Sequence, residues 1–116
     1  MIAAEKWRWY GLAGHLIVSA RCRFHLCTVV GKYIVSTVGA YYQKGEDKKP
    51  TEIGAGRLYE TFVFKVGKGE CDCGCGLPSV VDWSEIDADS YNDARAANEG
   101  HLKMCRKYAR KLKEGA

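Results

Sequence analysis

Half of the six cysteines in this chain fall in one short segment, Cys71-Asp72-Cys73-Gly74-Cys75. Further along, His101 and Cys105 stand four residues apart in a stretch with helical spacing, so they share one side of the helix because 3.6 residues make one turn. Thiolates in a turn that face such a His–Cys pair match the ligands of a tetrahedral zinc ion. The pattern predicts a structural Zn²⁺ site that joins the turn to the helix.

The predicted zinc ligands are Cys73, Cys75, His101 and Cys105, with Cys71 as the alternative ligand from the turn. Four protein ligands close the coordination shell, so we expect this zinc to be structural and not catalytic. The Cys-x-Cys spacing departs from the usual Cys-x-x-Cys of zinc sites, and three thiols exceed what this one requires. The alternative interpretation is that His101 and Cys105 are ordinary core residues, because buried cysteine is common.

With 116 residues and 47% hydrophobic composition, the chain is expected to form a single domain, residues 1–116. No run approaches the 18 or more apolar residues of a membrane span. Glycines and His15 interrupt the apolar run from Trp9 to Ala20, so we expect this run to belong to the fold and not to a signal peptide. Disulfides between Cys-x-Cys neighbours would be strained. We therefore expect an intracellular, cytoplasmic protein.

Two segments, 21–30 and 58–66, alternate as strands do, and a third, 33–38, is predicted to be a strand because it is rich in β-branched residues. Between 21–30 and 33–38, Gly31-Lys32 suits a two-residue hairpin turn. That turn would place Phe24 opposite Gly39, where a ring can cover the missing side chain. Residues 43–56 are expected to form a loop. Residues 67–78 are expected to form a turn region that needs a further interaction to hold its conformation.

A C-terminal helix is predicted with Ser84 or Asp89 as its cap, acids in its first turns and bases in its last. Its buried side is predicted from residues at helical spacing: Ala94, Ala97, His101, Cys105, Tyr108 and Leu112. Gly100 within it costs up to about 1 kcal/mol relative to alanine. The expected fold class is α+β, a small antiparallel sheet of three or four strands with a C-terminal helix and a zinc-clipped turn.

The formal net charge of +4 conceals a bipolar C-terminal third, in which acids between residues 82 and 99 precede bases after residue 101. The basic residues are candidates for binding nucleic-acid phosphates: Lys103, Arg106, Lys107, Arg110 and Lys111. We expect them to spread around the helix and not to form one stripe, which weakens that interpretation.

A second candidate surface combines aromatic and basic residues near the N-terminus with other arginines. Its members are predicted to contact a partner: Trp7, Arg8, Trp9, Arg21, Arg23 and Arg57. The alternative is that these aromatics belong to the core.

The group His15, Cys22, His25 and Cys27 is also chemically suggestive. A Cys–His pair can form a nucleophile, and His25 and Cys27 share one face of a strand. No sequence signal marks an oxyanion hole or an orienting carboxylate for them. The competing interpretations are alternating side chains of a half-buried sheet and a second metal site.

Four sequence blocks together resemble a group of short accessory proteins carried by tailed phages and prophages. They are Trp9-Tyr10-Gly11-Leu12-Ala13-Gly14-His15, Val35-Ser36-Thr37-Val38-Gly39, Tyr59-Glu60-Thr61-Phe62-Val63-Phe64 and Cys73-Gly74-Cys75-Gly76-Leu77-Pro78. No activity is attached to that group, so no functional residue is carried over. The resemblance implies a phage protein that acts in the cytoplasm of a host bacterium. Small phage accessory proteins often bind and neutralise a host protein or a signalling nucleotide.

From these observations we expect a non-enzymatic binding protein, an inhibitor or sequestering antagonist of a host defence protein or signalling nucleotide. The alternative is a nucleic-acid-binding regulator that uses the basic helix, and a third interpretation is a hydrolase built on His25 and Cys27. No membrane partner is expected, and a homodimer is compatible with the sequence.

Overall fold

The computed structural model describes residues 7–9, 22–42, 48–53, 56–70, 78–80 and 85–114. In chain order its elements are β1 (Trp7–Trp9), β2 (Cys22–Val30), β3 (Tyr33–Tyr41), β4 (Tyr59–Glu70), β5 (Pro78–Val80), β6 (Asp87–Tyr91) and α1 (Ala94–Glu114). All strand pairs are antiparallel, in the order β1-β2-β3-β4-β5, and β6 also pairs with β4. The expected α+β class, an antiparallel sheet with a C-terminal helix, is confirmed. No helix in the described ranges is long and apolar enough to span a bilayer.

The β2–β3 hairpin turns at Gly31 and Lys32, as predicted. Val30 pairs with Tyr33, and Gly31 adopts a φ of 58°, a conformation that glycine reaches without steric cost. The turn fixes the register along the hairpin, so Phe24 lies opposite Gly39. This part of the prediction is confirmed.

The ring that covers Gly39 comes from the strand on its other side. Gly39 also pairs with Tyr59 of β4, and a Cβ on Gly39 would lie 2.0 Å from a carbon of the Tyr59 ring. The Phe24 ring meets the Tyr59 ring edge to face, with centroids 5.2 Å apart. Any larger residue at 39 would therefore displace Tyr59.

The strand predicted over 58–66 is longer than expected and continues to Glu70. The first half of β4 pairs with β6 and its second half with β5. Residues 67–70 therefore belong to a strand and not to the predicted turn region.

The helix begins later than predicted, and the predicted caps are wrong. Asp89 lies in β6, because residues 87–91 pair with β4 instead of entering the helix. Asp93 is the N-cap: its Oδ1 accepts a hydrogen bond of 2.8 Å from the Ala96 amide. Ser84 lies outside the described residues. The first turn of α1 contains no acid.

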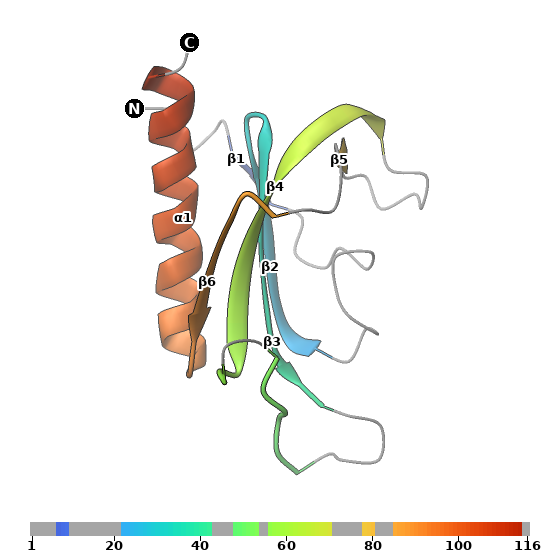
Figure 1. Cartoon of the computed structure of the whole chain (residues 1–116), viewed down its shortest axis with the longest axis vertical. Coiled ribbons are helices and arrows are strands. Elements are labelled where there is room, and N and C mark those ends of the chain that lie inside the picture. The colour runs from blue at the N-terminus through green and yellow to red at the C-terminus, as the bar shows by residue number, and fades with distance from the viewer. Residues whose placement is uncertain are drawn as a thin grey trace.

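Helix α1 lies along one face of the sheet, beside β6 (Figure 1). Most of its predicted buried side is confirmed, except for Ala94, which is exposed, and Leu112, which is partly buried. The core against the sheet also contains two residues absent from the prediction, Met104 and Ala109. Cys27, Val29, Ile34 and Phe64 form a second buried cluster. Because side chains alternate along a strand, this cluster occupies the sheet face opposite α1.

Candidate functional site

His101 lies between α1 and the sheet and is hydrogen-bonded through both ring nitrogens. Its Nε2 is 2.8 Å from Thr28 Oγ1, and its Nδ1 is 2.8 Å from Thr37 Oγ1. Thr37 Oγ1 is in turn 2.6 Å from Thr61 Oγ1, to which the Tyr91 hydroxyl donates at 3.1 Å. These groups are buried, and we call them, with Cys105, the His101 network. It joins α1 to β2, β3, β4 and β6.

The network has one proton arrangement in which each hydroxyl donates once. Tyr91 donates to Thr61, so Thr61 can donate to Thr37, and Thr37 to Nδ1 of the His101 ring. Nε2 then carries the ring proton and donates to Thr28. The Thr28 hydroxyl remains as a donor for its hydrogen bond with Cys105. We therefore assign the Nε2–H tautomer to His101.

These contacts do not fit the predicted zinc site. A histidine that binds zinc offers the lone pair of one ring nitrogen to the metal, and here threonine hydroxyls occupy both. Cys105 is 0% exposed, and burial raises the pKa of its thiol to about 12, although its Thr28 contact and the charge of Arg106 act in the opposite direction. The arrangement supports the alternative interpretation, that His101 and Cys105 are core residues.

The other predicted zinc ligands, Cys71, Cys73 and Cys75, lie outside the described residues. Within the part of the chain that the structure describes, no three potential ligands are grouped to hold a metal ion. The zinc-clipped turn is thus not supported as part of the fold.

The His101 network has no group suited to catalysis at neutral pH. Burial lowers the pKa of His101 to about 4, so the ring is neutral. The thiol of Cys105 is protonated for the same reason, and both side chains are closed off from solvent. The network therefore holds the helix to the sheet.

In the second cysteine–histidine group, the structure places two members on the sheet face opposite α1. Cys27 is buried in the second cluster, and His25 lies two residues before it on β2. The Nδ1 of His25 is buried without a hydrogen-bond partner. His15 and the side chain of Cys22 lie outside the described residues. The predicted nucleophile and second metal site stay predictions.

The five candidate basic residues of α1 form one stripe, although we expected the basic positions to spread around the helix. At 100° per residue, they fall within an arc of roughly 140°. All are exposed, on the side opposite His101, and we call them the basic stripe: Lys103, Arg106, Lys107, Arg110 and Lys111. Cys105 and Tyr108 are buried on the opposite side of the helix, so this arc faces solvent.

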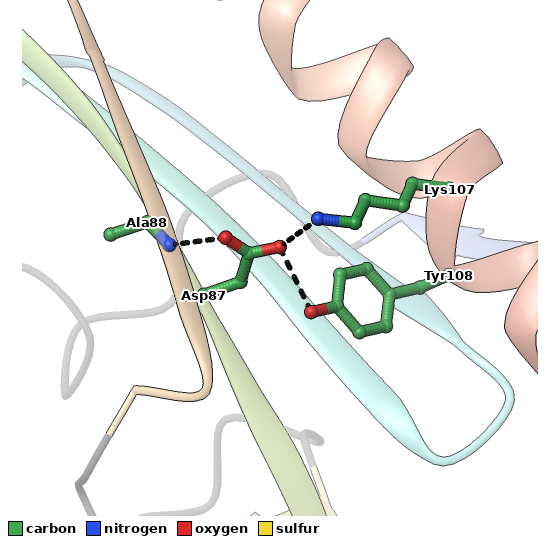
Figure 2. Close-up of polar contacts among 4 residues, drawn as sticks. All are labelled: Asp87, Ala88, Lys107 and Tyr108. Carbon is green, nitrogen blue, oxygen red and sulfur yellow. Dashed lines mark hydrogen bonds and ion pairs between the residues drawn. The ribbon is translucent and has the colours of Figure 1, made fainter.

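Asp87 of β6 binds the middle of the basic stripe (Figure 2). Its Oδ2 lies 2.6 Å from Lys107 Nζ and accepts a 3.0 Å hydrogen bond from the Tyr108 hydroxyl. Its Oδ1 accepts a hydrogen bond from the Ala88 amide at 2.9 Å. Burial acts to raise the pKa of Asp87, but Lys107 and these hydrogen bonds outweigh it and hold the pKa below 3.8. The acidic and basic halves of the C-terminal third thus meet across β6 and α1.

A groove of about 190 Å³ runs between β6 and α1 next to this ion pair, and we call it the β6–α1 groove. Its lining residues are Asp87, Ala88, Asp89, Gly100, Lys103, Met104, Lys107 and Arg110. One wall therefore carries two carboxylates and the other carries three members of the basic stripe.

More lysines surround a pair of tyrosines near the end of the stripe. The rings of Tyr33 and Tyr108 meet edge to face, with centroids 4.6 Å apart. Lys32 Nζ lies 5.9 Å from the Tyr33 ring, and Lys111 Nζ lies 5.8 Å from the Tyr108 ring. Lys65 is exposed and pairs with Tyr33 across the sheet. The fold thus extends the positive surface from α1 onto the β2–β3 hairpin and β4.

The predicted aromatic and basic partner-binding surface is described only in part. Trp7, Arg8 and Trp9 form β1, which pairs with the end of β2, and Arg57 is exposed. The side chains of β1, Arg21 and the side chain of Arg23 lie outside the described residues. That surface stays a prediction.

Comparisons with family models, with curated proteins and with solved structures found no match to this chain. The resemblance to phage accessory proteins therefore remains an expectation.

Sequence reasoning did not single out the acidic wall or the threonine partners of His101. Alternation along the strands puts Thr28, Thr37 and Thr61 on the same face of the sheet. Three hydroxyls on the face that a helix covers indicate hydrogen-bond partners for a polar residue of that helix. Asp87 carries no such signal, since its segment is predicted to contain or to precede the start of the helix.

Proposed function

We propose that this chain is a non-enzymatic binding protein whose binding face is the outer side of α1. The strongest support is that the helix carries two kinds of polar group on opposite sides. Those facing inward are satisfied within the His101 network, whereas the five cations of the basic stripe are exposed on one arc. Only Lys107 among them has an ion-pair partner among the described residues. Exposed charges of one sign favour a partner of the other sign.

The partner that fits best is a protein with an acidic surface. Asp89 lines the groove beside the stripe, and its charge, unlike that of Asp87, has no ion-pair partner among the described residues, so it would repel the phosphates of a nucleic acid or a nucleotide. A protein surface can offer charges of both signs. In line with the resemblance to phage proteins, we propose that this partner belongs to the host, for example to a defence system, and that binding inhibits or sequesters it.

A nucleic-acid-binding regulator remains the second candidate function. The basic residues lie on a narrower arc of the helix than we expected, which favours contact with a phosphate backbone. Five cations on one arc of a helix are an electrostatic footprint of nucleic-acid binding. A signalling nucleotide would use the same cations with fewer contacts.

The proposal is tested by titrating the protein with poly-L-glutamate, random-sequence duplex DNA and nucleotides at low and moderate salt. We expect poly-L-glutamate to bind, and Arg106→Gln with Arg110→Gln to weaken binding about tenfold, since each exposed charge contributes up to about 1 kcal/mol. Lys49→Gln is the control, because Lys49 is exposed in a segment outside α1 and the groove.

Two results would overturn the proposal. One is no binding of poly-L-glutamate even at low salt. The other is tighter binding of duplex DNA with a steep loss of affinity as salt rises, which would favour the nucleic-acid regulator.

A further inference from the structure

The β6–α1 groove has walls of opposite charge. Asp89 is exposed on the β6 wall, and Lys103 and Arg110 are exposed on the α1 wall. Lys107 and Asp87, which also line the groove, are already joined in an ion pair. The charges available to a ligand are therefore one carboxylate on one side and two cations on the other.

The dimensions of the groove suit a short stretch of extended chain. Lys103 and Arg110 are seven residues apart, which corresponds to about 10 Å along a helix. Side chains on one side of an extended chain are about 6.6 Å apart, at two residues of about 3.3 Å each, so the long side chains of Lys103 and Arg110 would have to span the remaining distance of about 4 Å. Between the charged walls the lining includes two small residues, Ala88 and Gly100, which allow a main chain to approach closely, and the apolar Met104.

The groove does not offer the usual route for adding a strand to β6. The Ala88 amide donates to Asp87 Oδ1 at 2.9 Å, and the Ser90 amide donates to Asp89 Oδ1 at 2.8 Å. A strand that joins a sheet edge needs main-chain donors and acceptors on that edge. With these two donors occupied, recognition would depend on side chains.

We propose that the β6–α1 groove binds an extended segment of the partner protein in which acidic and basic side chains alternate. Successive side chains of an extended chain point to opposite sides. An alternating segment therefore presents its acids to Lys103 and Arg110 and its base to Asp89. This inference rests on the proposed function, because it names the part of the protein partner that this face recognises.

The test compares two capped hexapeptides of identical composition, one alternating glutamate and lysine and one with three glutamates followed by three lysines. Binding is measured by the shifts of the amide NMR signals of Ala88 and Gly100 on titration. We expect the alternating peptide to bind at least about fivefold more tightly, because only it matches both walls at once.

Matched variants locate the peptide. Lys103→Gln and Arg106→Gln remove the same kind of charge from the same helix, but only Lys103 lines the groove. We expect Lys103→Gln and Asp89→Asn each to weaken binding of the alternating peptide about threefold to tenfold, and Arg106→Gln to change it less than twofold. Equal affinity for the two peptides, or equal effects of Lys103→Gln and Arg106→Gln, would overturn the inference.

The failure of this inference can be told apart from the failure of the proposed function. If poly-L-glutamate still binds through the basic stripe while the two peptides bind alike, only the groove assignment is wrong. If poly-L-glutamate does not bind either, both are overturned.

Discussion

The inner side of α1 carries polar groups that are buried and hydrogen-bonded, whereas its outer side carries polar groups that are exposed to solvent. On the inner side, His101 is 2% exposed and both its ring nitrogens are hydrogen-bonded to threonines. On the outer side, Lys107 is 47% exposed at the side chain, and its ion pair with Asp87 borders an open groove. A buried polar group must be satisfied by the fold, whereas an exposed one remains able to bind a partner. His101 and Cys105 thus belong to the packing of the helix on the sheet, whereas exposed lysines, arginines and aspartates line the candidate binding face.

The largest expected effect comes from removing the centre of the inner network. His101→Ala leaves a cavity and deprives Thr28 and Thr37 of their buried partner. We expect the free energy of unfolding to fall by about 3 to 5 kcal/mol, measured by urea denaturation. Leu102→Ala, at a neighbouring position that is 39% exposed, is the control. A loss below about 1 kcal/mol would show that the network does not hold the helix.

The same histidine makes stability depend on pH. Burial lowers the pKa of His101 from 6.5 to about 4, so the folded protein disfavours the proton that the unfolded chain accepts. Stability is then fully present above about pH 6.5 and falls by up to about 3 kcal/mol as the pH drops toward 4. His101→Gln should flatten the curve between these values. An unchanged slope in that variant would assign the effect to another group.

A smaller loss of stability is expected at Gly100. Alanine usually stabilises a helix relative to glycine, but at this position we expect it to destabilise the protein. A Cβ at this position would lie 2.3 Å from atoms of the Tyr91 side chain, whose hydroxyl donates to Thr61 at the end of the network. Gly100→Ala should therefore destabilise the protein by about 1 to 3 kcal/mol through overpacking, despite the better helix propensity of alanine. Asn98→Ala, at an exposed helix position, should be neutral or slightly stabilising. Equal melting temperatures for the two variants would contradict the close packing.

Removing the charge of Asp87 should lower the free energy of unfolding by less than the Gly100 substitution does. Asp87→Asn weakens the ion pair with Lys107 and the hydrogen bond from Tyr108, both near the surface. We expect a loss of about 0.5 to 1 kcal/mol that shrinks at high salt. Because the pKa of Asp87 is lowered, its contribution exists above 3.8 and is lost as pH falls through the lower folded value. A loss independent of salt would mean that the hydrogen bonds, not the charge, matter.

The smallest expected effect concerns metal content. If zinc binds this chain, the occupied ring of His101 is not among its ligands. The zinc content per chain, measured by plasma mass spectrometry, should then be the same for the wild type and for His101→Gln. A lower content in the variant would restore the predicted zinc site.

Local patterns predicted the parts of the fold that depend on neighbours in sequence. Gly31 and Lys32 fixed the hairpin register, and helical spacing identified His101, Cys105 and Tyr108 as buried. The ring over Gly39 could not be assigned, because Tyr59 arrives from a strand whose register no tight turn sets.

The candidate site was not predictable for a similar reason. The β6 segment Asp-Ala-Asp-Ser-Tyr has little intrinsic strand preference, and its acids suggested a helix start. It forms a strand because it pairs with β4, which lies far from it in sequence. The acidic wall of the groove follows from that pairing.

The aspartate-capped amides of β6 also bear on how this protein behaves at high concentration. Among the described strands β6 pairs with β4 alone, so its other side is a place where copies of the chain could stack into fibrils. Carboxylates at 87 and 89 already occupy the donors of Ala88 and Ser90, and their charges repel the same edge of a second molecule. We therefore expect the two side chains that line the groove also to disfavour edge-to-edge pairing between copies of the chain.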